Sequence, residues 1–192
     1  MNCSRPPEAE DKTTFINTFY GSGIRGFGTG FPKKTVLVLR IKNGKENLYL
    51  VIRNDWGDRH AEVKLKSYLD NLSRSRSMPN YLKTCKFVIY MNYAPCNNCA
   101  DVLIKLFNIC NGGSVKFTGL YTRGDNRQNY LGWESLKENV AFRYMQQDDY
   151  DELGIAPPIS VVQNNREHNR YAARKMPENC RDDFIQFSGS LL

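Results

Sequence analysis

The order of apolar and polar positions along the chain predicts five β-strands. Two segments rich in strand-forming residues, Thr35–Ile41 and Asn47–Arg53, flank the turn signal Asn43-Gly44, a pattern typical of a β-hairpin. Three more segments of similar composition follow at Lys86–Asn92, Val115–Tyr121 and Asn139–Met145. These five segments predict the strands of one sheet.

Helical periodicity occupies the intervals between these strands. Helices are expected at about residues 61–72, 96–110 and 131–138, with a shorter amphipathic helix at 13–19. Asn71–Asn80 is expected to be a basic exposed loop between a helix and a strand. Because strands and helices alternate, the pattern predicts an α/β fold, in which helices cover both faces of the sheet and the functional site lies at the strand ends.

Length and charge narrow the class of protein. A chain of 192 residues with 41% hydrophobic and 24% charged residues is typical of one soluble globular domain. The net charge of +7 and the pI of about 9.1 favour polyanionic partners such as nucleic acid, although many basic proteins bind none. No apolar segment is long enough to span a membrane, and Met1–Asp11 is polar and lacks a signal-peptide core. A cytoplasmic or nuclear location is therefore expected, or a secreted one if a leader has been removed.

Two short motifs carry the candidate chemistry. One is His60-Ala61-Glu62, and the other is Pro95-Cys96-Asn97-Asn98-Cys99. One imidazole and two thiolates supply three zinc ligands, and a catalytic zinc uses three so that water occupies the fourth position. Both motifs are predicted at the starts of helices, where the backbone dipole lowers the pKa of a thiol. Glu62 is then placed to move protons for a zinc-activated water.

Simpler explanations of these motifs compete with a catalytic site. Cys96 and Cys99 could instead form a redox pair or half of a structural zinc site, which would need a fourth ligand such as His168 or another cysteine. A redox pair, however, has no need of an upstream His-x-Glu. The combined pattern H-x-E…P-C-x-x-C is the signature of zinc-dependent nucleobase deaminases, which favours the catalytic interpretation.

Other features of the sequence leave alternatives open. Four further cysteines, Cys3, Cys85, Cys110 and Cys180, could form disulfides, and reduced thiols are slightly favoured. The glycine-rich segment Gly21–Phe31, which carries Arg25, is either a loop that closes over a nucleic-acid strand or a flexible connector. Near the C-terminus, three arginines at four-residue spacing share one helix face, which is either simply solvated or a stripe that tracks phosphates: Arg166, Arg170 and Arg174.

The chain resembles the AID/APOBEC family of polynucleotide cytidine deaminases over about residues 15–154. Arg59-His60-Ala61-Glu62 and Asn92–Cys99 carry the resemblance, and Leu120-Tyr121 with the polar loop after it adds to it. The resemblance implies the cytidine deaminase fold, a five-stranded mixed sheet flanked by helices on both faces. It implies a single domain of residues 1–192, with a core of about 13–154 and a helical extension of 155–192.

The resemblance also implies roles for individual residues. One Zn²⁺ per chain is expected on His60, Cys96 and Cys99, with Glu62 as the catalytic acid and base. Tyr121 is expected to stack on the target base, Asn54 to hold the sugar, and the loop with Arg123 to read the neighbouring nucleotide. The expected substrate-contacting set is Arg25, Asn54, Ala61, Tyr93, Ala94, Tyr121 and Arg123.

The chain departs from the family in places. The family's Ser-Trp-Ser before Pro-Cys is Asn92-Tyr93-Ala94, so that an aromatic wall is kept at Tyr93 while a hydroxyl is lost at Ala94. The expected activity is hydrolytic deamination of cytosine to uracil in single-stranded nucleic acid, with DNA favoured over RNA, in an innate-immune or mutator role. Two alternatives stay open: a deaminase of free cytidine or its nucleotide, and a catalytically idle zinc fold that only binds nucleic acid or a partner. The presence of Glu62 speaks against the idle fold.

Overall fold

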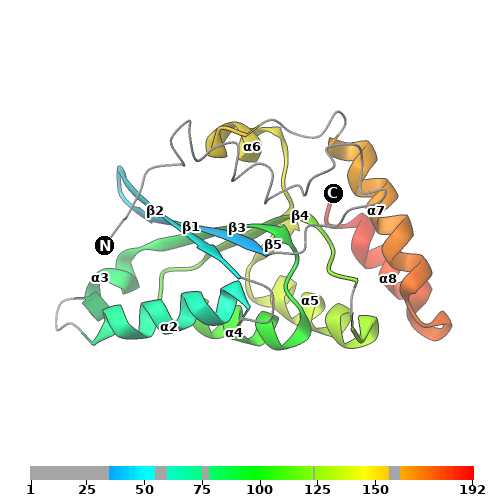
Figure 1. The fold of residues 1–192 in the computed structure, drawn as a ribbon, viewed down its shortest axis with the longest axis horizontal. Coiled ribbons are helices and arrows are strands. Elements are labelled where there is room, and N and C mark those ends of the chain that lie inside the picture. The colour runs from blue at the N-terminus through cyan, green and yellow to red at the C-terminus, as the bar shows by residue number, and fades with distance from the viewer. Residues whose placement is uncertain (1–34, 55–59, 75–77, 123, 156–160) are drawn as a thin grey trace.

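The computed structural model describes residues 35–54, 60–74, 78–122, 124–155 and 161–192 (Figure 1). Its five strands form one mixed sheet in the order β2-β1-β3-β4-β5. β1 pairs antiparallel with β2 and β3, whereas β3, β4 and β5 run parallel to one another. The strands are β1 (Val36–Asn43), β2 (Glu46–Arg53), β3 (Lys86–Tyr93), β4 (Gly113–Gly119) and β5 (Ala141–Tyr144). The expected α/β class and five-stranded mixed sheet are confirmed.

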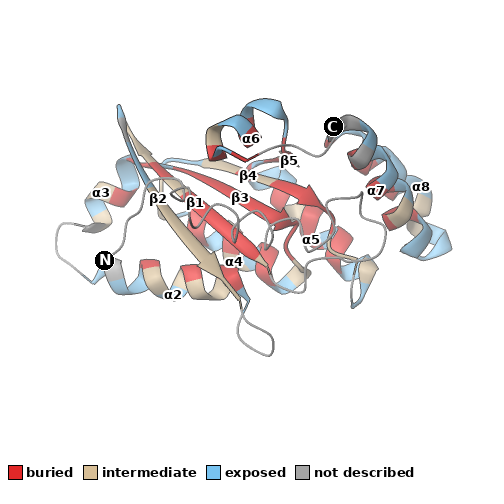
Figure 2. Ribbon diagram, turned by 45° about the horizontal axis from the view of Figure 1, so that its top comes forward, coloured by how far each residue is buried: buried red, intermediate tan, exposed pale blue. Residues whose placement is uncertain are grey.

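Three long helices cover one face of the sheet, below it in Figure 1: α2 (Ala61–Ser73), α4 (Asn97–Phe107) and α5 (Asn126–Asn139). Their apolar sides and the sheet form the main core, in which Trp133, Phe87 and Phe117 are almost completely buried. Figure 2 shows this burial concentrated on the central strands and on the inner sides of the helices. The core therefore fixes the starts of α2 and α4, which carry the two sequence motifs.

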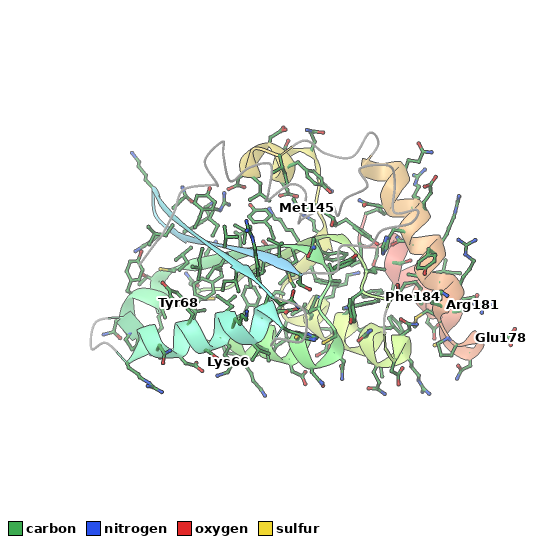
Figure 3. All side chains as sticks on the ribbon, in the orientation of Figure 1. Lys66, Tyr68, Met145, Glu178, Arg181 and Phe184 are labelled. Carbon is green, nitrogen blue, oxygen red and sulfur yellow. The ribbon has the colours of Figure 1, made fainter. Side chains whose placement is uncertain are left out.

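A short helix, α6 (Gln147–Leu153), covers the opposite face, so helices flank the sheet on both faces as expected. It packs Tyr150 and Leu153 over a smaller apolar cluster that includes Met145, labelled in Figure 3. Polar side chains surround this cluster. Asp149 of α6 bonds Lys116 and Arg143 of β4 and β5, and Glu152 pairs with Arg40 of β1.

The C-terminal region forms two packed helices, α7 (Val161–Lys175) and α8 (Arg181–Gly189), joined by the 3₁₀ turn η1 (Glu178–Cys180). Phe184 of α8 faces Tyr130 and Trp133 of α5, whereas Arg181 lies further out (Figure 3). No helix in the described ranges combines the length and apolar character that crossing a membrane requires.

One expectation for the connecting segments is wrong. Instead of an exposed loop throughout Asn71–Asn80, α2 continues to Ser73 and a short helix, α3 (Met78–Thr84), follows it. Pro79 is the second residue of α3, where its missing N–H costs no helical hydrogen bond. Leu82 of α3 is buried against the core, so burial determines this helix more than its polar composition does. The expected helix at residues 13–19 lies outside the described residues.

Candidate metal centre

The two motifs meet at the starts of α2 and α4. The ligand atoms of His60, Cys96 and Cys99 all lie within 4.8 Å of one another. His60 Nδ1 lies 3.2 Å from the sulfur of Cys99 and 3.5 Å from that of Cys96. Tetrahedral zinc with bonds of about 2.0 Å to nitrogen and 2.3 Å to sulfur would hold such atoms about 3.5 Å apart. The three side chains therefore fit a zinc ion without rearrangement of the backbone.

Local backbone structure explains why the ligands converge. The carbonyl of His60 accepts hydrogen bonds from Val63 and Lys64, so His60 occupies the cap position of α2. Cys96 is the N-cap of α4, and Cys99 lies in its first turn. The ligands thus come from two neighbouring helix N-termini, whose positive dipole ends stabilise thiolates.

Cys96 and Cys99 interact closely enough that each shifts the pKa of the other. A hydrogen bond from Cys99, with the nearby His60 as a further cause, lowers the pKa of Cys96 to about 5. The pKa of Cys99 lies above its ordinary value because its thiol donates to Cys96 and is itself buried. One ligand is therefore a thiolate at neutral pH, and a coordinating metal deprotonates the second.

Glu62 is the second residue of α2, interacts with all three ligands and is only 3% exposed. Burial is the main cause that raises its pKa to about 7, and the neighbouring Cys96 thiolate adds to it. Its Oε2 atom is buried and, among the described residues, accepts no hydrogen bond. A carboxyl group in this state can take up or release a proton near neutral pH, as a general acid–base catalyst must.

Two tyrosines lie together at the neighbouring ends of β3 and β4. Tyr93, at the end of β3, and Tyr121, just after β4, meet edge to face with their ring centres 6.2 Å apart. Ala94 follows Tyr93 and donates its N–H to the carbonyl of Gly119, which ties the ends of β3 and β4 together. Ala61 is fully buried at the start of α2. The structure thus brings Tyr93 and Tyr121 together, and their contact with substrate stays a prediction.

The other expected substrate residues are placed unevenly. Asn54 follows β2, and its side-chain oxygen accepts a hydrogen bond from the backbone N–H of Thr35 at 2.5 Å. That bond joins the end of β2 to the start of β1, so the Asn54 carboxamide already has a structural partner. Arg25 and Arg123 lie outside the described residues. The sugar-binding role of Asn54 stays a prediction.

His168 does not belong to the metal centre. It is buried in α7, where its Nε2 accepts the N–H of Leu120 at 2.8 Å, and burial lowers its pKa to about 4. The ring therefore supports the chain immediately before Tyr121. Among the described residues, His60, Cys96 and Cys99 are the only group of metal-ligating side chains, so a structural site completed by His168 is disfavoured.

Sequence reasoning missed three residues of α5 that hold the cysteine turn: Asn129, Gly132 and Trp133. The indole of Trp133 donates to the carbonyl of Pro95 at 2.6 Å, and Asn129 accepts the N–H of Asn97 at 3.1 Å. A signal for Asn129 exists in the sequence. It lies four positions before Trp133 and seven before Leu136, so it is a polar residue on an apolar helix face.

The remaining cysteines and the arginine stripe lie away from the ligands. Cys85, Cys110 and Cys180 carry free thiols, and Cys3 lies outside the described residues. The three arginines of α7 are exposed and, with Arg181 of α8, line a groove of about 510 Å³ that contains no acidic side chain among its lining residues: Arg166, Asn169, Arg170, Ala173, Arg174, Arg181, Ile185, Ser188, Gly189 and Leu192.

Comparisons with known proteins give limited similarity. No protein-family model matches the sequence, and no curated protein is significantly similar to it. Among solved structures, the chain is similar to the dCMP deaminase from the cyanophage S-TIM5, in its apo form and in complex with dCMP and dUMP. These alignments cover 57% of this chain and 79% and 80% of those chains, at 15% and 13% identity, each with a TM-score of 0.33.

Proposed function

We propose that the protein is a zinc-dependent deaminase that converts cytosine to uracil in single-stranded DNA. The observation that carries this proposal is the buried Glu62 carboxyl beside a group of three metal ligands; one of its oxygens accepts no hydrogen bond from the residues that the structure describes. A structural zinc site uses four protein ligands, and a redox pair has no need of a buried acid. Three ligands with a neighbouring carboxyl group instead suit the hydrolysis of a C–N bond.

The chain's own residues supply the proton transfers of this reaction. Zinc bound in such a site supplies a hydroxide nucleophile near neutral pH. Glu62 accepts the proton that water loses and delivers protons to the ring nitrogen N3 and to the departing amine. Cytosine and water thus become uracil and ammonia. Because the pKa of Glu62 is about 7, the same carboxyl can hold and release a proton in one cycle.

The aromatic pair supplies a place for the base. Tyr121 is half-buried, so part of its ring remains accessible, and its edge-to-face contact with Tyr93 restricts its orientation. Stacking of a base on an aromatic side chain contributes about 1–3 kcal/mol. We therefore assign Tyr121 to the stacking platform and Tyr93 to the wall of the base pocket.

Charge favours a polymer over a free nucleotide as the substrate. The net charge is +7, and four arginines line the groove between α7 and α8. Free cytidine would not need these charges, whereas a nucleic-acid strand is attracted by them along its length. A single strand is preferred because in a duplex C4 of cytosine is stacked, and flipping the base out costs a few kcal/mol.

The experiment that tests this proposal compares four substrates. Purified zinc-loaded protein is incubated with a single-stranded cytosine-containing DNA, its duplex, the matching RNA and free dCMP, and uracil formation is measured. We expect the fastest conversion on single-stranded DNA, slower conversion on the duplex, and a loss of at least fivefold for Tyr121→Ala, which corresponds to about 1 kcal/mol. If only dCMP is converted, the substrate is a free nucleotide and not a polymer. If no uracil forms from any of the four substrates, the proposed function is contradicted.

A further inference from the structure

Three segments meet behind the metal centre, at the side chain of Asn129. This residue lies in the first half of α5 and is 4% exposed. Its Oδ1 accepts a hydrogen bond from the backbone N–H of Asn97, at the start of α4, over 3.1 Å. Its Nδ2 donates to the backbone carbonyl of Tyr121 over 3.4 Å. One buried carboxamide therefore connects the turn of the metal ligands to the loop of the aromatic platform.

The contact with the cysteine turn is close as well as polar. A Cβ atom at Gly132 would lie 2.9 Å from the Cα of Asn97, so only glycine permits this approach of α5 to α4. Trp133, on the same side of α5, bonds the carbonyl of Pro95. Residues 129, 132 and 133 are spaced three and four apart on one helix face. This face therefore holds both backbone residues that flank Cys96.

The chemistry of the side chain suits both partners. The N–H of Asn97 is one of the N-terminal donors of α4 that have no partner within the helix, so it needs an external acceptor. The carbonyl of Tyr121 needs a donor. Asparagine offers an acceptor and a donor from one planar group. Of two side chains of similar size, ionised aspartate only accepts hydrogen bonds and leucine neither accepts nor donates them.

We propose that Asn129 is a positioning residue that sets the metal ligands and the base platform relative to each other. Its Oδ1 fixes the cysteine turn, and its Nδ2 fixes the backbone of Tyr121. The first half requires only the observed group of ligands, while the second rests on the proposed function. Loss of the acceptor should therefore weaken metal binding, and loss of the donor should weaken substrate binding.

Two variants separate the two halves. Asn129→Leu removes both hydrogen bonds, whereas Asn129→Asp keeps the acceptor and loses the donor. The matched control is Asn139→Leu, because Asn139 lies on the same helix, is exposed and donates its side-chain hydrogen bond to Ser135 of α5. Metal affinity is measured by competition with a zinc chelator, and ligand geometry by the visible thiolate absorption of the cobalt(II)-substituted protein. Substrate binding is measured as KM and kcat on the single-stranded cytosine oligonucleotide.

We expect Asn129→Leu to lose about 10–100-fold in metal affinity, as other outer contacts of metal ligands do, and to change the cobalt spectrum. Asn129→Asp should keep the wild-type spectrum and a metal affinity within threefold, while its KM rises by about fivefold, equivalent to one hydrogen bond of about 1 kcal/mol. Asn139→Leu should match the wild type in all three measurements.

Other results overturn the proposal. If folded Asn129→Leu keeps the wild-type metal affinity and cobalt spectrum, Asn129 only packs the core. Equal losses of metal affinity in both variants would refute the division of roles. If Asn129→Leu does not fold, the Asp variant still decides between a change in KM and a change in metal affinity. If the wild type deaminates nothing, the proposed function fails, but the chelator and cobalt measurements test the metal half independently.

Discussion

Glu62 is buried beside the three metal ligands but is not one of them, so a substitution at Glu62 can test catalysis separately from metal binding. We predict that Glu62→Gln, which keeps the size of the side chain but cannot accept a proton, lowers kcat by at least about 10²–10⁴-fold. Zinc content, measured by elemental analysis, should stay near one equivalent. Cys99→Ala is the contrasting variant and should lose most of the zinc. Activity of Glu62→Gln within tenfold of the wild type would show that another group moves the protons.

The residues of the site differ in how far the sequence predicts them. His60, Cys96, Cys99 and Glu62 follow from chemistry that is local to two short motifs, and the structure brings them together. Asn129 acts on backbone atoms of segments 32 and 8 residues away, and no local motif specifies such a contact. Its position on an apolar helix face was a usable signal, but such a signal does not identify the partner.

At the scale of single elements, α6 is held on the sheet by one buried carboxylate. Asp149 is 3% exposed and accepts hydrogen bonds from Arg143 at 2.6 Å, from Lys116 at 2.5 Å and from the N–H of Gln146 at 2.8 Å. We predict that Asp149→Asn lowers the free energy of unfolding by about 3 kcal/mol, because it leaves two partly buried cations without a counter-charge. Urea denaturation measures this loss. Asp148→Asn, at an exposed position on the same helix, is the control and should change little.

The same carboxylate predicts a dependence on pH. Burial alone would raise the pKa of Asp149, but the hydrogen bonds from Arg143, Gln146 and Lys116 outweigh burial, so the pKa lies below its ordinary 3.8. The pKa of Lys116 is also lowered, because the effect of burying its ammonium group is larger than the opposing effect of Asp149. This shift affects the stability only at alkaline pH, where lysine loses its proton. A carboxyl group whose pKa is lower in the folded chain than in the unfolded chain stabilises the fold at pH values above its unfolded-state pKa. This stabilisation is lost as the pH falls through its folded-state pKa. The stability difference between wild type and Asp149→Asn should therefore be constant between pH 5 and 7, about 1–3 units above the ordinary aspartate pKa, and shrink below pH 3.8. A difference that does not change with pH would contradict this assignment.

The short length of α6 and α3 explains why these two helices were not predicted. Both span seven residues, which is too short for helical periodicity to be distinguished from a loop. α6 depends on the capping box between Gln146 and Asp149 and on the ion pairs of Asp149 with β4 and β5. α3 depends on the burial of Leu82. The capping box is local to the start of α6, but the ion pairs with β4 and β5 and the burial of Leu82 are tertiary, so they became visible only in the structure.

For the whole molecule, the groove between α7 and α8 offers a test of the polymer substrate. Within the described residues, none of its four arginines forms an ion pair, so their charges remain available to phosphates. We predict that replacing Arg166, Arg170 and Arg174 by Gln weakens binding of a single-stranded oligonucleotide and lowers the slope of log K against log salt by about 2, at about 0.7 per phosphate contact. Fluorescence anisotropy at several salt concentrations measures both changes.

The control for this prediction is a triple variant with the same loss of net charge, from +7 to +4 by removal of three positive charges. Lys83, Lys86 and Lys105 are exposed on α3, β3 and α4, and their replacement by Gln serves this purpose. If the two triple variants lose the same slope, only net charge matters and the groove is not a phosphate contact. Conversion of free dCMP should change in neither variant.

The number of strands was predictable, because each strand lies in a segment rich in strand-forming residues. The family resemblance implied a five-stranded mixed sheet, but the order β2-β1-β3-β4-β5 was not predicted, since alternation of strands and helices does not fix which strands pair. The C-terminal helices show the same limit. The four-residue spacing predicted that the arginines share one face of α7. It did not predict that α7 packs on α8, or that His168 supports the chain before Tyr121.

The origin of the ligands at two helix starts, with His60 and Cys96 separated by 36 positions, also affects folding thermodynamics. The three ligand atoms converge only after β3 has paired within the sheet, so the unfolded chain offers no comparable binding site. An ion that binds only the folded chain shifts the folding equilibrium, by about 2.7 kcal/mol at a free concentration one hundred times its dissociation constant. We therefore expect the concentration of free zinc to affect the stability of the protein as well as its activity. A cell that withdraws the metal would lower the folded population of this protein together with its turnover.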